Sequence, residues 1–172
     1  MLKQIGKTRR TPPDVVALML DCHGKIRHFV ALARAAGEAS AEPAEVADAC
    51  AQARRYFAEA LPLHIADEEE SLLPRLRGRD AGLDRALAAM HDEHEAHGPH
   101  VTALLEALTR VHDAPTDAAL RGQLASSAAA LARSFDAHLE AEEQHVFPAL
   151  RSLLSEPEQH AILGELRARR QP

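Results

Sequence analysis

Two segments of this 172-residue chain repeat one pattern of a histidine, a pair of glutamates and a proline. Residues 64–76 and 138–150 align without a gap as His-φ-x-x-Glu-Glu-x-x-φ-φ-Pro-x-Leu, where φ is an apolar residue. Residues four apart lie about one turn apart on one helix face, so each histidine projects beside its first glutamate. The second glutamate points roughly 100° away and is the weaker candidate for the same site. The repeat predicts two helices that each carry a His-x3-Glu unit.

Apolar residues recur at helical spacing through most of the chain, which is rich in Ala, Leu, Glu and Arg and only 3% aromatic. Such a composition favours helix over sheet. We expect helices over residues 14–37, from 40–43 to 78, about 80–112, about 116–154, and from a Ser155-x-x-Glu158 capping box through 170. Short connections predict an all-α, up-down-up-down four-helix bundle over 14–154, a disordered or extended tail over 1–13, and a short C-terminal fifth helix within 155–172.

Four prolines fall inside the expected helices, at positions 62, 74, 99 and 148. A proline inside a helix removes one backbone hydrogen bond and kinks or breaks the helix. The apolar period continues across Pro62 and Pro99, which favours local kinks over breaks. Pro74 and Pro148 are predicted to mark the start of the final turns of their helices.

Eleven histidines are far more than a chain of this length ordinarily carries, and they are spread over several segments. The two helices without the repeat each place one histidine on the apolar stripe, at His23 and His94. In an antiparallel bundle, groups in the middle of all four helices meet at one level. The predicted site therefore combines six side chains from four helices: His23, His64, Glu68, His94, His138 and Glu142.

Six polar groups inside an apolar core require compensation, because a buried ionised carboxylate is costly unless it is paired or bound to a metal. One interpretation is a hydrogen-bonded layer of histidine and glutamate. The duplicated His-x3-Glu unit favours metal binding instead. Imidazole and carboxylate without thiolate suit iron, manganese, zinc or copper.

Six protein ligands exceed what one tetrahedral zinc uses, so two metal ions fit this ligand set better. Two glutamates could bridge the ions, and two histidines could complete the protein ligands of each. Three further histidines are weaker candidates. His91 and His97 lie one turn from His94 and could be extra ligands or partners of ligands, and His145 could have an outer or channel role.

The formal net charge of −6 argues against nucleic acid or an anionic membrane as the main partner. No apolar run approaches the roughly 20 residues of a membrane span, and the first 13 residues lack the apolar core of a signal peptide. Cys22 and Cys50 are too few for a disulfide framework. We expect a soluble protein in a reducing, cytoplasmic setting.

These motifs resemble the hemerythrin-like family, also called the HHE cation-binding domain, over roughly residues 14–154. The resemblance is carried by residues 21–27, 64–74, 93–94 and 138–148. It implies a four-helix bundle with a non-haem di-iron site whose two irons share an oxo or hydroxo bridge. The implied nitrogen ligands are His23, His64, His94 and His138, and the implied bridging carboxylates are Glu68 and Glu142. Ligand chemistry alone also allows zinc or manganese.

One departure bears on function. Oxygen-carrying hemerythrins usually place two histidines four apart on the third helix, whereas here Gly98 follows His94 at that spacing. The site resembles the family's branch with four histidines and two carboxylates, which shifts the expected role from oxygen storage toward a reactive or sensing centre. The first hypothesis is a protein that binds or senses oxygen, nitric oxide or peroxide. Such a sensor would signal through a homodimer or a redox partner. The second is a redox enzyme or an iron-donating repair protein, and the third is a bundle with a structural metal.

Overall fold

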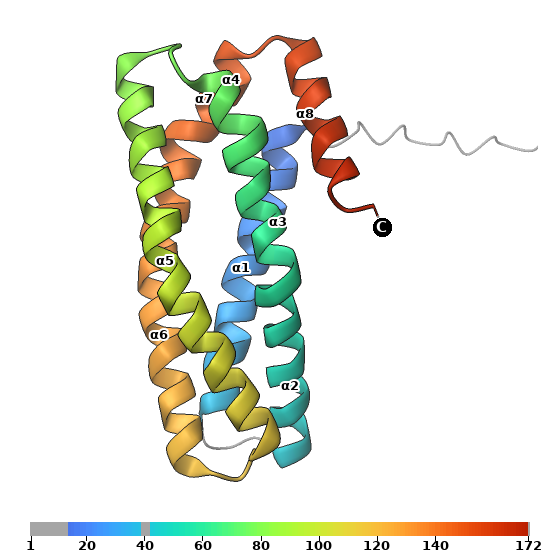
Figure 1. Cartoon of the computed structure of the whole chain (residues 1–172), viewed down its shortest axis with the longest axis vertical. Helices are drawn as coiled ribbons and strands as arrows, with labels where there is room; N and C mark the ends of the chain where they lie inside the picture. Colours follow the sequence, from blue (N-terminus) through green and yellow to red (C-terminus); the bar gives the residue numbers. More distant parts are fainter. Residues whose placement is uncertain (1–13, 39–41, 172) are drawn as a thin grey trace, which may run out of the picture.

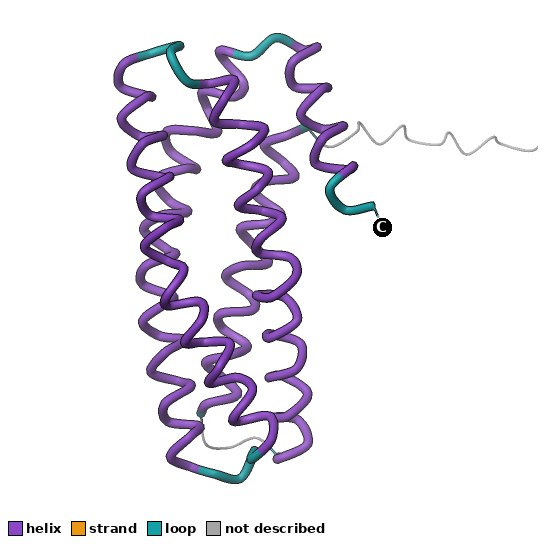
Figure 2. Tube along the Cα trace, viewed as in Figure 1, coloured by secondary structure: helices purple, strands orange, loops and turns teal. Residues whose placement is uncertain are grey.

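The computed structural model of this chain describes residues 14–38 and 42–171. These residues form helices joined by short loops, and no strand occurs among them (Figure 2). The tail predicted over residues 1–13 lies outside the described residues.

The helices run alternately down and up along one long axis (Figure 1). One helix descends, a second helical run climbs, a third helix descends, a fourth run climbs, and a short helix then lies beside the upper end. In chain order the elements are α1 (Val15–Gly37), α2 (Pro43–Arg55), η1 (Tyr56–Ala60), α3 (Leu61–Ala66), η2 (Asp67–Leu72), α4 (Leu73–Leu76), α5 (Ala81–Asp113), α6 (Ala118–Ala141), η3 (Glu142–Val146), α7 (Phe147–Leu153) and α8 (Glu156–Ala168). The predicted all-α bundle with a short C-terminal helix is confirmed.

The ends of the helices follow from local chemistry. Aspartate side chains accept hydrogen bonds from first-turn N–H groups at the starts of α1, α5 and α6, at Asp14, Asp80 and Asp117. The predicted capping box of Ser155 and Glu158 opens α8. At the end of α1, a Cβ on Gly37 would lie 2.6 Å from the backbone nitrogen of Ala125 in α6. Glycine therefore permits the close approach of α1 to α6.

Wide π-helical turns accommodate three of the four prolines. The η1, η2 and η3 segments each end just before a Leu-Pro or Phe-Pro pair, and the residue preceding the proline donates its N–H to the carbonyl five residues back. Such turns are rare in proteins as a whole, and those that occur often lie at functional sites. The short α4 and α7 begin immediately before Pro74 and Pro148, which agrees with the predicted start of the final turns. Pro99 lies inside α5, which continues without a break.

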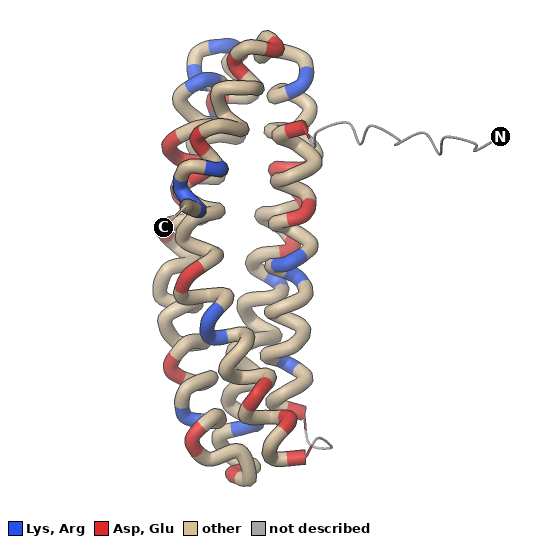
Figure 3. Tube along the Cα trace, turned by 90° about the vertical axis from the view of Figure 1, so that its right-hand side faces the viewer, with Lys and Arg blue, Asp and Glu red and all other residues tan. Residues whose placement is uncertain are grey.

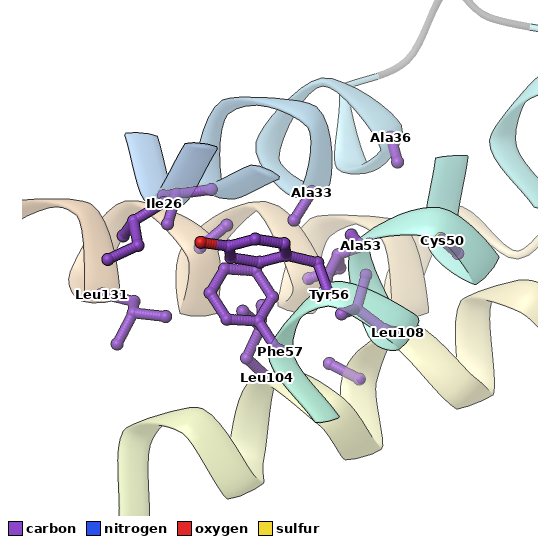
Figure 4. Packing of buried hydrophobic residues seen from close by; sticks show 14 of the residues in the cluster. Ile26, Ala33, Ala36, Cys50, Ala53, Tyr56, Phe57, Leu104, Leu108 and Leu131 are labelled. Carbon is purple, nitrogen blue, oxygen red and sulfur yellow. The ribbon is translucent and has the colours of Figure 1, made fainter. Parts of the chain in front are cut away.

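Two apolar clusters fill the bundle, one on each side of a polar layer. In the lower cluster, the rings of Tyr56 and Phe57 pack among small and aliphatic side chains (Figure 4). Tyr56 also stacks on Phe29 with 4.3 Å between ring centroids, which indicates a packing role. Along α1, Met19 belongs to the upper cluster and Ile26 to the lower one, so His23 lies between them.

The α8 helix docks on the upper half of the bundle through apolar and charged contacts. Its Ile162 and Leu166 are buried in the upper cluster. Just beyond its end, the guanidinium groups of Arg169 and Arg170 pair with both oxygens of the fully buried Asp67. Arg169 also donates to the hydroxyl of Ser71 at 2.9 Å. The end of the chain is thereby attached to η2.

Acidic and basic residues are interspersed along the helices (Figure 3). Within the described ranges, no helix combines the length and the apolar character that crossing a membrane requires.

Candidate metal centre

Four helical runs bring the six predicted side chains together between the two apolar clusters. The six-residue cluster comprises His23 of α1, His64 of α3, Glu68 of η2, His94 of α5, His138 of α6 and Glu142 of η3. None of these side chains is more than 7% exposed. The heptad spacing of the inward residues and the His-x3-Glu units place all six at one level of the bundle.

The first half of the cluster contains His23 and His64. The Nε2 of His23 lies 3.1 Å from Oε2 of Glu142 and 3.9 Å from Oε1 of Glu68. The Nε2 of His64 lies 3.3 Å from the same Glu68 oxygen. One oxygen of each carboxylate therefore faces this histidine pair.

The second half contains His94 and His138, which face the other carboxylate oxygens. The Nε2 of His94 lies 3.2 Å from Oε2 of Glu68 and 3.9 Å from Oε1 of Glu142. The Nε2 of His138 lies 3.2 Å from Oε1 of Glu142. Each carboxylate thus presents one oxygen to each histidine pair, so cations on both sides of the cluster could share the two carboxylates.

The unpaired atoms of the cluster test whether metal ions fit. In the described structure, buried atoms without a hydrogen-bond partner include both oxygens of Glu68 and Glu142 and the Nε2 atoms of His23, His64 and His94. A hydrogen-bonded polar layer would satisfy these atoms. Metal ions hold such donors at about 2.0–2.2 Å, so neighbouring ligands lie about 3–3.5 Å apart. The shorter N–O distances in each half match this spacing, so the residues fit metal ions.

Three further carboxylates hold the outer nitrogens of the histidine rings. In each case an Nδ1–H group donates to a glutamate oxygen. His23 donates to Oε1 of Glu143 (2.8 Å), His94 to Oε1 of Glu69 (2.7 Å) and His138 to Oε2 of Glu93 (2.7 Å). A carboxylate is an acceptor only, so these bonds fix the tautomer that leaves Nε2 free to bind a metal. His64 differs, because its Nδ1 is buried with no partner among the described residues.

Comparison with known families agrees with this geometry. Residues 14–150 match the model of the hemerythrin HHE cation binding domain. The chain belongs to this family. No curated protein matches the chain. The HHE domain is a helical bundle whose His/Glu groups can hold metal ions, and the resemblance inferred from the sequence is confirmed.

The roles of individual residues in this HHE domain stay predictions, although the structure brings all six together. The role of the outer carboxylates as hydrogen-bond partners of the histidines was not predicted from the sequence. Glu69 and Glu143 are the second glutamates of the repeat, and their duplication was the available signal. Glu93 is not part of the repeat, and it entered the sequence interpretation only as the neighbour of His94 in the family resemblance.

The electrostatics of the metal-free HHE domain favour protonated histidines on two helices. Burial alone would lower the pKa of His23, but Glu142, Glu68 and Glu143 outweigh it and raise the pKa to about 9. Burial alone would also lower the pKa of His94. Glu68, Glu69 and Glu142 outweigh this effect and raise the pKa to about 9.

The two carboxylates of the cluster are pushed in opposite directions. Burial and the adjacent Glu68 raise the pKa of Glu142 to about 8. Burial would raise the pKa of Glu68 as well, but His64, His23 and His94 lower it well below the usual range. Without metal, the cluster therefore holds protons that cations would displace.

The three weaker histidine candidates lie in different surroundings. His91 is exposed and donates from Nδ1 to Oε2 of Glu69 at 2.9 Å. It therefore helps to hold the carboxylate that accepts the hydrogen bond of His94. His97 is 5% exposed and packs edge-on against the ring of His138, with 4.9 Å between centroids. His145 is exposed and lines a surface groove between α5 and α7. None of the three belongs to the described groups that could hold an ion.

Proposed function

We propose that this HHE domain binds two iron ions in the six-residue cluster, and that the centre binds or senses a small diatomic molecule or oxidant such as oxygen, nitric oxide or peroxide. The observation that carries the proposal is the pair of carboxylates, each of which presents one oxygen to each histidine pair. Bound iron would supply the coordination positions and electrons for such a ligand.

The protein's own residues prepare the site for this role. The three outer carboxylates orient the rings of His23, His94 and His138, so the inward nitrogens are held in place before a metal arrives. The two apolar clusters exclude bulk water from both sides of the layer. A small cavity adjoins the cluster and is lined partly by its histidines. A small ligand would meet a narrow pocket beside the metal ligands.

Anaerobic purification, iron analysis and optical titration with oxygen, nitric oxide and peroxide test the proposal. We expect about two irons per chain and an absorption change on addition of at least one ligand. Stoichiometric zinc with no response to any of the three would contradict it. The matched variants are His64→Ala, which should lose metal, and His160→Ala, which removes an exposed histidine and should keep it.

A redox enzyme is the second candidate, and one contact favours it. A hydrogen-bonded chain runs from solvent to the cluster. The exposed His91 contacts Glu69 at 2.9 Å, and Glu69 contacts His94 of the cluster at 2.7 Å. Protonation of His91 would change the charge around Glu69 and thereby the electron donation of His94 to bound iron, on which turnover of peroxide or nitric oxide would depend. Multiple turnovers that slow in His91→Leu would favour the enzyme, whereas a stoichiometric change without turnover would favour a binder or sensor.

A further inference from the structure

A cavity of about 10 Å³ lies beside the six-residue cluster. This space holds about one water-sized molecule, which excludes organic substrates. Four imidazole rings line it, and the rest of its wall is apolar: the lining residues are His64, His94, His97 and His138 with Ile26, Leu61, Ile65, Phe135 and Leu139. A molecule in this cavity would touch histidines of both halves of the cluster.

His97 differs from the other three histidines in this wall. It is 95% buried, yet its Nδ1 has no hydrogen-bond partner in the part of the chain that the structure describes. Its ring is held edge-on between Phe135 and His138, with centroid distances of 4.8 and 4.9 Å. A buried polar atom without a partner is costly, so its presence beside a cavity indicates that a bound molecule supplies the partner.

We propose that His97 is a specificity-determining residue that hydrogen-bonds a small neutral molecule of two or three atoms held in this cavity. The inference rests on the proposed function, because the molecule would also contact metal bound by His64, His94 and His138. The imidazole supplies either a donor or an acceptor, depending on its tautomer. The apolar remainder of the wall favours an uncharged ligand, since burying a charge among Ile, Leu and Phe side chains is costly.

The infrared stretching frequency of nitric oxide bound to the iron-loaded protein tests this contact without measuring turnover. In the wild type we expect the band to move when the solvent is exchanged for D2O. The His97→Leu variant should keep its iron, lose this movement, and release nitric oxide about fivefold faster, which corresponds to the loss of one hydrogen bond. His97→Gln should restore both properties in part, and the exposed His145→Leu should behave as wild type.

The outcomes separate this inference from the proposed function. If nitric oxide binds and neither its band nor its release rate depends on His97, the hydrogen bond is refuted while the di-iron proposal stands. If the iron-loaded wild type forms no complex with nitric oxide, oxygen or peroxide, both are overturned. Should His97→Leu fail to fold, the D2O experiment on the wild type decides, because an immobile band contradicts the hydrogen bond.

Discussion

The outer carboxylates are the residues whose contribution is most separable from metal ligation. Glu143 accepts hydrogen bonds from His23 and from Arg27, both at 2.8 Å. Glu143→Ala should lower metal affinity about 10- to 100-fold, because the ring of His23 loses the bond that sets its tautomer and orientation. Glu140→Ala, one turn earlier and exposed, is the matched control. Competition with a chelator of known affinity measures both, and equal affinities would contradict the assigned role of Glu143.

The raised pKa values of His23 and His94 predict how metal binding depends on pH. Both are raised from 6.5 to about 9, so both are protonated at pH 7 in the metal-free protein and must release protons when an ion binds. Metal affinity should therefore rise from pH 7 to 9. Calorimetry in two buffers with different ionisation enthalpies would detect the released protons. The same heat in both buffers would contradict this prediction.

The same groups give the metal-free protein the opposite pH dependence. A histidine whose folded-state pKa is raised contributes stability below the unfolded value of 6.5 and loses it as pH rises through about 9. The raised pKa of Glu142 acts in the same direction, because the folded state favours its neutral form. Urea denaturation of metal-free protein should give a lower midpoint at pH 9 than at pH 6.5. A higher midpoint at pH 9 would show that these histidines are neutral.

At the level of single residues, the sequence predicted the six-residue cluster because its members recur at fixed spacing on four helices. The partners of those residues were harder to predict. Whether Glu69 contacts a histidine depends on the rotation of one helix against another, which heptad spacing does not define. The burial of His97 depends likewise on how α5 packs against α6.

Among the elements, η2 carries Glu68 and also the buried Asp67, which joins it to the end of α8. Asp67 is fully buried, while Arg169 and Arg170 are 19% and 38% exposed. Replacing both arginines by glutamine would leave a buried carboxylate without its cations. We expect a loss of about 2–4 kcal/mol in the free energy of unfolding. This is less than the loss expected for a fully buried ion pair, because the arginines are partly exposed.

The Arg169→Gln/Arg170→Gln variant should also retain metal less well, because Asp67 directly precedes Glu68. The control is Arg167→Gln, which removes an exposed arginine in the last turn of α8, two residues before Arg169. Urea denaturation and metal loss to a chelator measure the two effects. If the double variant matches the control in both, α8 has no part in holding η2.

The elements themselves were largely predictable, whereas their internal distortions were not. Capping residues and apolar period gave the limits of α1 and α5 to within a few residues. The sequence indicated kinks at prolines, but a proline alone does not determine whether a helix bends or widens into a π turn. The packing of α8 was equally unspecified, because a capping box marks a helix start and not its neighbours.

For the whole molecule, the site joins all four helical runs in the layer between two separate apolar clusters. Metal ions held there would cross-link the runs, so metal loading should raise the melting temperature. Scanning calorimetry of loaded and metal-free protein checks this. An unchanged melting temperature would indicate that the ions do not bind the folded chain more tightly than the unfolded chain.

We predict that a small ligand reaches the cavity past Ile26 and Phe135. A groove of about 210 Å³ between α1 and α6 shares Ile26 and Phe135 with the cavity wall. Phe135→Trp should slow ligand association, because a larger ring narrows the shared wall, and should leave iron content unchanged. Stopped-flow mixing with nitric oxide measures the rate. Equal rates in the variant and the wild type would exclude this route.

The overall topology followed from the sequence because four apolar stripes with short connections leave few ways to bury them. The cavity beside His97 did not follow, since it arises from how side chains of four helices fill one layer.

The number of metal ions bound per chain tests the di-iron proposal most directly. Anaerobic titration of metal-free protein with ferrous iron should saturate at two ions per chain in the wild type and in His160→Ala. Both His64→Ala and Glu142→Ala should bind fewer ions, because each removes a side chain from the cluster. Saturation at one ion, or two ions retained by both cluster variants, would contradict a di-iron site built from these six residues.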